Sequence, residues 1–229
     1  SRLDNPSVFV LSAYIWNQNY NIDLAKAVKD KWPDCKIIIG GPSVPNNDPE
    51  FFAKSPWIDY LIHQEGEISF SGLLRSFVND MDIKEVPGIS INYKGKMHTT
   101  GPSKRLNDLS GIPSPYTSGL FDDILQKARR QGIKLNGIIE TNRGCPFQCT
   151  FCDWGGTTFS KIKKFNMQRI TDEIKWFGKN KVELVTNADA NFAIFKERDT
   201  QITDVLIATK EKYGYPMIFD TCWSKNTND

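Results

Sequence analysis

Short apolar runs alternate with stretches of helical periodicity along this chain, and this alternation restricts the fold more than any other feature. In the first half, the apolar runs 8–15, 36–39 and 57–62 are separated by segments with apolar residues at helical spacing. The segment 67–80 continues the pattern as an amphipathic helix. Because strands separated by helices pair in parallel, the sequence predicts an α/β fold with an open parallel sheet and helices on both faces.

The alternation is interrupted once, and the interruption predicts the domain organisation. After a hairpin pattern, the segment 106–119 is rich in Pro, Gly and Ser, which makes it the best candidate linker. A second strand–helix alternation follows it. We therefore expect a first α/β domain over 1–110, a linker and helix over 111–135, and the start of a strand–helix barrel over 136–229.

Composition excludes several classes of protein. The 29 basic residues nearly balance the 27 acidic ones without long runs of one sign, so nucleic-acid binding is not indicated. No apolar run approaches the roughly 18 residues of a membrane helix. Five cysteines are an odd number, and their clustering predicts a reducing, cytoplasmic compartment rather than a disulfide scaffold. The chain begins SRLDNPSV, without a secretory leader, which we interpret as a processed chain or a fragment.

Three of the five cysteines lie within eight residues, as Cys145, Cys149 and Cys152 in the spacing C-x3-C-x2-C. A structural zinc site takes four ligands, commonly from two paired knuckles, and the two histidines of the chain, His63 and His98, lie far upstream. Three thiolates are sufficient for a four-iron cluster with one iron left open to a small molecule. The loop follows a predicted strand, where parallel barrels place their reactive loops.

This spacing, with Phe151 directly before the last cysteine, resembles the signature of the radical S-adenosylmethionine superfamily. The resemblance implies that Cys145, Cys149 and Cys152 ligate a [4Fe-4S] cluster and that S-adenosylmethionine chelates the fourth iron. It also implies that the reduced cluster cleaves S-adenosylmethionine to a 5′-deoxyadenosyl radical, with Phe151 near the adenine. Such enzymes take electrons from a donor such as flavodoxin or ferredoxin. The isolated cysteines, Cys35 and Cys222, are expected to be small buried residues.

The family's next element follows the second barrel strand and contacts the methionyl amino group through a Gly-Gly-Glu-like stretch. This chain has TNADANF, residues 186–192, at that place. Asn187, Asp189 and Asn191 supply polar atoms for the same role, although the glycines are absent. The alternative is that Asp189 and Asn191 form a turn or a helix cap. The chain also has fewer strand–helix units after residue 136 than the family's barrel, so truncation is expected.

The first half resembles the cobalamin-binding domain that precedes many radical S-adenosylmethionine enzymes. The matching stretches are LSAYIWN (11–17), IIIGGPSVP (37–45) and IDYLIHQEGEISFSGLL (58–74). Glycines after a parallel strand let a ligand approach the backbone. The resemblance places these residues at the cofactor: Ser12, Tyr14, Trp16, Gly40, Gly41 and Gly66. The Asp-x-His-x-x-Gly motif is absent, and we expect His63 to be a loop or packing residue.

Alternatives remain for the first half: Gly40 and Gly41 form only a tight turn, and Tyr14 and Trp16 belong to the core. The resemblance implies a Rossmann-like, cobalamin-binding-like domain followed by the start of a radical S-adenosylmethionine partial barrel. The implied reaction is cobalamin-dependent methyl transfer to an unactivated carbon of a small-molecule substrate. No catalytic side chain is identified beyond the cluster. The rivals are a radical enzyme of another reaction type with an empty first domain, a non-enzymatic metal-stabilised binding module, and a degenerate fragment without activity.

Overall fold

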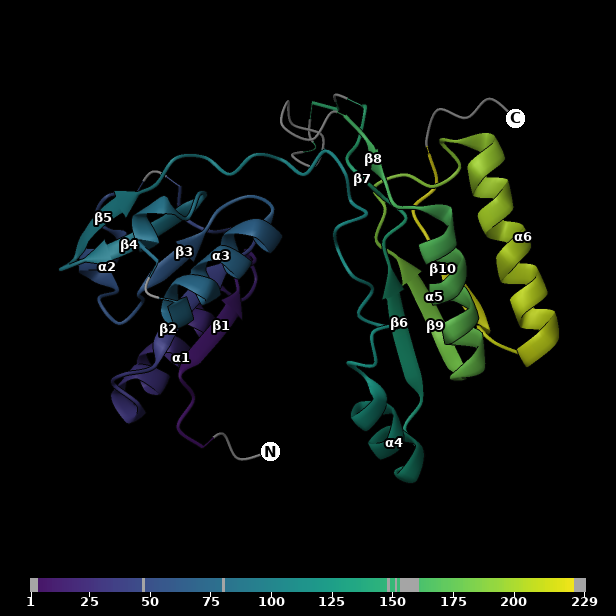
Figure 1. The fold of residues 1–229 in the computed structure, drawn as a ribbon, viewed down its shortest axis with the longest axis horizontal. Helices are drawn as coiled ribbons and strands as arrows, with labels where there is room; N and C mark the ends of the chain where they lie inside the picture. Colours follow the sequence, from purple (N-terminus) through teal and green to yellow (C-terminus); the bar gives the residue numbers. More distant parts are fainter. Residues whose placement is uncertain are drawn as a thin grey trace. The chain divides into compact units, whose positions relative to one another are not determined.

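The computed structural model of the protein has two compact units, Ser1–Leu106 and Asn107–Asp229, which follow one another along the chain (Figure 1). The structure describes residues 4–46, 48–79, 81–147, 149–150, 152 and 161–224. Within these residues no helix is both long and apolar enough to cross a membrane. The assignment of a cobalamin domain, a linker and a barrel to 1–110, 111–135 and 136–229 stays a prediction.

The first unit is an α/β sheet whose parallel strands come first and whose hairpin comes last. Its strand order is β1-β2-β3-β4-β5. The first three strands pair in parallel, and β4 and β5 extend the sheet antiparallel, so the sheet is mixed. Its elements are β1 (Val8–Ser12), α1 (Gln18–Lys31), β2 (Lys36–Gly40), α2 (Phe51–Lys54), β3 (Tyr60–Ile62), α3 (Gly66–Asn79), a 3-10 turn (Ile83–Glu85), β4 (Ile89–Tyr93) and β5 (Lys96–Thr99).

The central strand β2 explains why helices cover both faces of this sheet. Successive side chains of a strand point to opposite faces. Ile37 and Ile39 accordingly belong to one buried cluster, with residues of α1 and α2, whereas Ile38 belongs to another, with residues of α3. All three isoleucines are buried. Strand β2 therefore needs a continuous apolar run, because both of its faces are buried. The prediction that helices cover both faces of the sheet is confirmed.

The second unit has a three-stranded, wholly parallel sheet in the order β10-β9-β6. Its elements are α4 (Asp122–Arg130), β6 (Leu135–Ile139), β7 (Asn142–Arg143), β8 (Lys163–Lys164), α5 (Met167–Lys179), β9 (Val182–Asn187), α6 (Lys196–Tyr213) and β10 (Ile218–Asp220). Each parallel step passes through one helix, α5 between β6 and β9 and α6 between β9 and β10. This confirms the expected strand–helix repetition.

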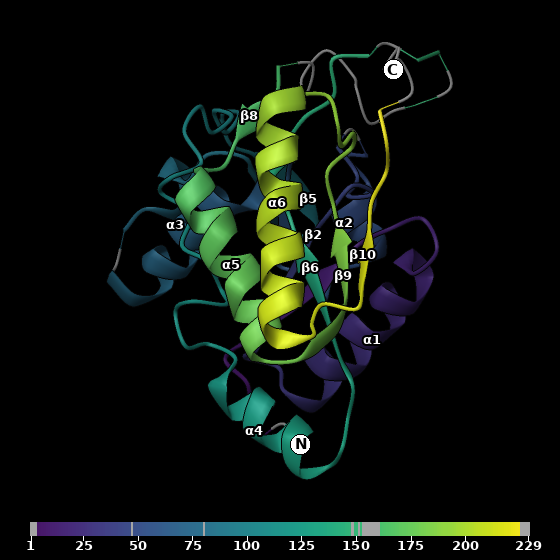
Figure 2. The same ribbon diagram turned by 90° about the vertical axis from the view of Figure 1, so that its right-hand side faces the viewer.

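Helices α5 and α6 lie side by side on one face of this sheet (Figure 2). They approach each other closely at Gly178, where an added Cβ would lie 2.4 Å from Thr209 Cγ2. Ile174 and Phe177 of α5 and Val185 of β9 are buried in the layer between helices and sheet. Ile138 and Ile218, on the strands, are largely exposed. The sheet is therefore buried on the side that the helices cover, whereas the apolar side chains of Ile138 and Ile218 are exposed.

The segment expected as a linker packs onto the second unit. The Tyr116 hydroxyl donates a hydrogen bond to the carbonyl oxygen of Ile138, at 2.5 Å, and accepts one from the Ile138 amide, at 3.0 Å. The Tyr116 ring also contacts the rings of Trp176 and Phe177 on α5. This stretch, rich in proline and glycine, is thus an irregular segment that packs on the second unit, and not a flexible linker.

Candidate functional site

The cysteine loop begins at the carboxyl edge of the second sheet. Ile139 at the end of β6 is in register with Asn187 at the end of β9, and the chain continues from β6 into β7 (Figure 1). Strands β7 and β8 pair antiparallel, with Asn142 opposite Lys164 and Arg143 opposite Lys163. This pairing closes the base of the loop, so both ends of the cysteine segment are fixed beside the sheet.

Asp189 fastens the loop after β9 to the start of the cysteine loop. Its side-chain oxygens accept hydrogen bonds from the Thr141 amide at 2.7 Å, from the Asn142 amide at 3.0 Å and from Asn142 Nδ2 at 2.7 Å. The Thr141 hydroxyl donates a further one. Asp189 is only 2% exposed. Burial raises the pKa of its carboxyl, and the hydrogen bonds from Thr141 and Asn142 act in the opposite direction.

The contact of Asp189 with S-adenosylmethionine stays a prediction. In the structure both of its carboxylate oxygens accept hydrogen bonds from residues of the same unit. The hydrogen bonds of its carboxylate to Thr141 and Asn142 are not those of a local turn or helix cap. The partners Thr141 and Asn142 are 48 and 47 residues away along the chain. Asp189 therefore joins two strand ends, a role that local sequence patterns do not reveal.

Arg198 holds both ends of the cysteine loop from α6. Its Nη2 donates to the carbonyl oxygen of Thr141, at 2.8 Å, and to that of Phe165, at 3.1 Å. The Phe165 amide also donates to the Thr141 carbonyl, at 3.0 Å. Sequence reasoning missed Arg198. The one sequence feature that could have identified Arg198 is its position in the first turn of a helix. The helix dipole disfavours a positive charge there unless a nearby acceptor offsets the cost.

The three loop cysteines have different environments. Cys145 is 9% exposed, and its sulfur accepts a hydrogen bond from Asn191 Nδ2 at 3.1 Å. Cys149 and Cys152 are exposed, and the Cys152 amide donates to the Cys149 carbonyl at 3.1 Å. Within the described residues, no group of three or more His, Cys, Asp or Glu side chains lies close enough to hold a metal. Their role as cluster ligands stays a prediction, and Phe151 lies outside the described residues.

The two isolated cysteines differ from each other. Cys35 is buried in the core of the first unit, as predicted. Burial raises the pKa of its thiol. Cys222 is exposed, so the expectation that it is buried is wrong. It lies two residues after the short strand β10, and its carbonyl accepts a hydrogen bond from the Phe192 amide while its side chain remains outside the core.

In the first unit, the predicted cofactor residues gather at one edge of the sheet. Ser12, the last residue of β1, is in register with Gly40, the last residue of β2, and Gly40 is in register with Ile62, the last residue of β3. Gly66 begins α3 shortly after β3. Ligands of open parallel sheets bind outside the carboxyl ends of the strands, where these residues lie.

Gly41 is required by the close approach of two loops at this edge. Its φ is +117°, and an added Cβ would lie 2.6 Å from the Ala13 carbonyl oxygen. The Ala13 amide donates to the Gly40 carbonyl at 2.6 Å, and the Ser43 amide donates to the Ala13 carbonyl at 3.2 Å. Gly40 has ordinary space around its Cβ position. The tight-turn alternative therefore accounts for Gly41, and cofactor contact at this pair stays a prediction.

Tyr14 and Trp16 do not belong to the core, so that alternative is wrong. Their rings stack, with centroids 4.6 Å apart and planes inclined by 11°, and Trp16 is 77% exposed. Two asparagines shape the loop that carries them. Asn17 accepts from the Tyr14 amide at 2.7 Å, and the side-chain amides of Asn17 and Asn21 both donate to the Ser12 carbonyl at 2.9 Å. Sequence reasoning missed both asparagines.

His63 is half-buried beside β4, where its Nε2 lies 2.7 Å from Ser90 Oγ. Among the described residues, its Nδ1 is buried without a hydrogen-bond partner. The His63 amide also donates to the Gly88 carbonyl, at 2.9 Å. Burial lowers the pKa of the imidazole. These contacts agree with the expected packing role.

We expect His63 to make the stability of the chain depend on pH. Because its folded-state pKa is lowered, the unfolded state binds the proton more readily, and the free energy of unfolding falls as pH decreases below about 6.5. Replacing His63 by Gln should reduce this fall, measured by urea unfolding between pH 7 and 5. His98→Gln, at an exposed position, is the control and should retain it. An unchanged pH dependence in the His63 variant would contradict the assignment.

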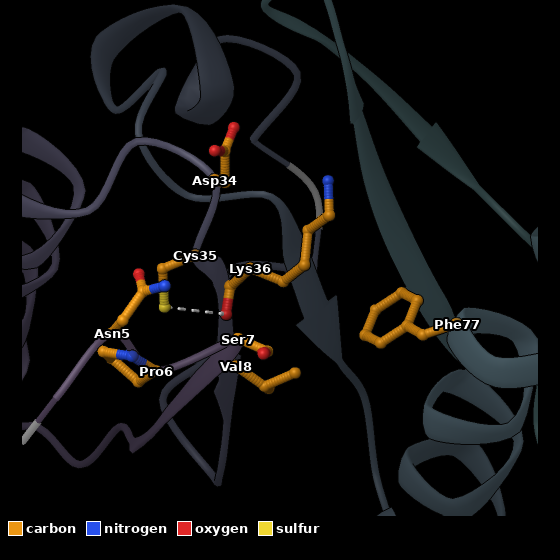
Figure 3. A pocket seen from close by; sticks show the side chains of 8 residues that line it. All are labelled: Asn5, Pro6, Ser7, Val8, Asp34, Cys35, Lys36 and Phe77. Atoms are coloured by element: carbon orange, nitrogen blue, oxygen red, sulfur yellow. Dashed lines mark hydrogen bonds between the residues drawn. The ribbon is translucent and has the colours of Figure 1, made fainter.

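A surface hollow of about 450 Å³ lies at the opposite edge of the first sheet (Figure 3). It includes Val8 and Lys36, the first residues of β1 and β2, which are in register. The lining residues are Asn5, Pro6, Ser7, Val8, Asp34, Cys35, Lys36 and Phe77. Because the predicted cofactor residues lie at the carboxyl ends of the same strands, this hollow is separate from the predicted site.

No protein-family model matches the chain. One curated relative is the cobalamin-dependent radical SAM methyltransferase TokK of Streptomyces tokunonensis, 40% identical over 226 residues, which are 98% of this chain and 33% of that protein. Another is the 2-(S-pantetheinyl)-carbapenam-3-carboxylate methyltransferase of Streptantibioticus cattleyicolor, 36% identical over 228 residues, which are 99% of this chain and 33% of that protein. The chain thus spans about a third of the length of the curated relatives it matches.

Among solved structures, the radical S-adenosylmethionine methyltransferase TsrM of Kitasatospora setae, with a tryptophan substrate and an S-adenosylmethionine analogue bound, is similar with a TM-score of 0.66. The identity is 13%, and the match covers 96% of this chain and 44% of that one. At this identity the likeness shows the fold alone. Together the relatives and the shared fold confirm the predicted resemblance and the α/β fold class.

Proposed function

We propose that this chain carries the cluster loop and a cobalamin-binding sheet edge of a radical S-adenosylmethionine methyltransferase. The proposal is supported by its homology to cobalamin-dependent enzymes of that kind. The reaction is methyl transfer to an unactivated carbon, initiated by a 5′-deoxyadenosyl radical. The observation that carries the proposal is the three-cysteine loop, which leaves β6 at the carboxyl edge of a parallel strand–helix sheet. Barrels of this construction place their reactive groups at that edge.

Cys145, Cys149 and Cys152 are donors of the kind that a [4Fe-4S] cluster takes, although the three side chains do not converge in the described part of the loop. All three thiols are free, and thiolates are the ligands that such clusters take. Cys145 is held beside the sheet by its hydrogen bond from Asn191. Exposure of Cys149 and Cys152 leaves both accessible to incoming iron and sulfide. When bound, the cluster supplies an electron for the cleavage of S-adenosylmethionine, and methylcobalamin supplies the methyl group.

The chain's own residues orient this loop. Asp189 fixes the residues that enter it, and Arg198 joins its two ends through the carbonyls of Thr141 and Phe165. We assign Asp189 to holding the loop, because its carboxylate already accepts four hydrogen bonds; its contact with S-adenosylmethionine stays a prediction. Phe151 is retained as the proposed neighbour of the adenine.

The first unit fits a flat, partly apolar ligand at the carboxyl edge of β1 and β2. The stacked rings of Tyr14 and Trp16 present an exposed aromatic surface there, and large exposed apolar groups at a sheet edge often mark a binding site. Ser12, Gly40 and Gly66 lie along the same edge. We propose cobalamin as the ligand of this edge, with Tyr14 and Trp16 facing the corrin.

For the whole protein we propose a small-molecule methyl acceptor and a cytoplasmic location, with a flavodoxin or ferredoxin as electron donor. The name of the Streptantibioticus relative gives a carbapenam carboxylate as its substrate. A carbapenam carboxylate is therefore the first acceptor to assay.

The test is anaerobic reconstitution of the chain with iron and sulfide, followed by iron analysis and EPR after reduction, with and without S-adenosylmethionine. We expect about four irons per chain and an EPR signal that changes when S-adenosylmethionine is added. Incubation with hydroxocobalamin and desalting should leave a corrinoid absorption spectrum on the protein. Zinc in place of iron would contradict the cluster loop, and a signal indifferent to S-adenosylmethionine would contradict binding of S-adenosylmethionine by this chain. Absence of corrinoid alone would contradict only the cobalamin edge.

A further inference from the structure

Asn191 makes a hydrogen bond that sets Cys145 apart from the other two loop cysteines. Its Nδ2 lies 3.1 Å from the Cys145 sulfur, although the two residues are 46 positions apart. Asn191 is 7% exposed and Cys145 9% exposed. Cys149 and Cys152 are exposed instead. The loop thus has one cysteine that is held by a residue of the segment after β9 and two that are exposed to solvent.

The backbone on both sides of Asn191 is anchored, so its amide is oriented before any ligand arrives. On one side, Asp189 is fixed by its hydrogen bonds to Thr141 and Asn142. On the other side, the Phe192 amide donates to the Cys222 carbonyl at 2.7 Å, and the Phe192 carbonyl accepts from the Ser224 amide at 2.8 Å. A side chain held in this way loses little conformational freedom when it makes its contact.

We propose that Asn191 is a positioning residue that presents Cys145 to the cluster and raises the cluster's reduction potential. The inference rests on the proposed function, since it requires a cluster on Cys145. A thiolate that ligates iron carries no proton, so only the NH2 end of the Asn191 amide can face it favourably. Such a donor stabilises the more negative, reduced cluster more than the oxidised one, and hydrogen bonds to the sulfurs are among the factors that set these potentials.

The test measures the potential of the reconstituted chain by EPR-monitored titration with dithionite, without S-adenosylmethionine. The variant Asn191→Leu keeps the volume and removes the donor. At a fixed potential we expect its ratio of reduced to oxidised cluster to fall on the order of tenfold, which corresponds to a downward shift of about 59 mV for one electron. Asn191→Ala should shift in the same direction. Asn191→Asp places a carboxylate against the thiolate and should lower the iron content.

Asn187→Leu is the matched control. Asn187, at the end of β9, carries a buried amide too; its Nδ2 donates to Thr221 Oγ1, at 3.2 Å, and its Oδ1 accepts from the Asp189 amide, at 3.3 Å, so neither atom is bonded to sulfur. This variant should keep the wild-type potential. A shift in Asn191→Leu without one in Asn187→Leu supports the inference, as does loss of iron from both the Leu and Ala variants of Asn191 while Asn187→Leu retains it.

Other outcomes overturn the inference, and they are distinguishable from failure of the proposed function. An unchanged potential in Asn191→Leu, equal shifts in Asn191→Leu and Asn187→Leu, or loss of iron from all variants at both positions would mean that the amide has no specific effect on the cluster. If the wild-type chain itself takes up no iron–sulfur cluster, the proposed function fails first.

Discussion

Replacement of Cys145, Cys149 or Cys152 by serine should remove the iron–sulfur cluster, whereas replacement of Cys222 by serine should leave it intact. In the proposed site each loop cysteine supplies one of three protein ligands, and a serine hydroxyl is a poor substitute for a thiolate on iron. After anaerobic reconstitution, iron should fall from about four atoms per chain to less than about one, and the EPR signal of the reduced protein should disappear.

The control is informative because Cys222 is also an exposed free thiol of the second unit. If iron binding were nonspecific association with exposed thiols, Cys222→Ser would lose iron in proportion to Cys149→Ser. Far-UV circular dichroism of all four variants should match the wild type, since a serine is close to cysteine in size. Retention of the cluster in any one of the three loop variants would show that this cysteine is not a ligand.

The sequence predicted the parts of the fold that depend on local periodicity. Strand β2 and helix α3 follow their apolar patterns closely, because each pattern matches the faces that the element must bury. Two features did not follow from such patterns. The hairpin β4–β5 joins the first sheet antiparallel, which depends on pairing with β3 rather than on the hairpin's own residues. Cys222 is exposed although it follows an apolar strand, because β10 pairs only with β9 among the described strands.

The candidate site was predictable only where a motif is contiguous. The cysteine spacing is visible directly, but the residues that hold the loop come from elsewhere in the chain. Asp189 reaches Thr141 across 48 residues, and Arg198 reaches it across 57. The residues next to Asp189 in the sequence suggest only a turn or a contact with a ligand. They contain nothing that identifies a partner so far away along the chain. The register of β6 with β9 is what brings them together.

The second large effect is expected for Asp189→Ala. The substitution leaves the amides of Thr141 and Asn142 without their acceptor, and both residues are buried. A buried donor without a partner costs about 1–3 kcal/mol, so we expect a loss of about 2–5 kcal/mol in the free energy of unfolding. Urea unfolding measures this loss.

Amide hydrogen exchange gives the local signature of the same change. Exchange at Thr141 and Asn142 should accelerate roughly tenfold or more, because their protection depends on the Asp189 carboxylate. Asp204→Ala removes an exposed carboxylate from α6 and should leave both stability and exchange close to wild type. Equal protection of the two amides in the Asp189 and Asp204 variants would contradict the assigned role.

Asp189→Asn separates the geometry of this contact from its charge. The amide keeps the shape of the side chain but offers one oxygen, and its NH2 group faces the donors of Thr141 or Asn142. We therefore expect a stability between those of the wild type and Asp189→Ala. Because the same two residues lead into the cysteine loop, the iron content after reconstitution should decrease in the same order. A chain that loses stability but binds iron as well as the wild type would show that Asp189 supports the fold without positioning the ligands.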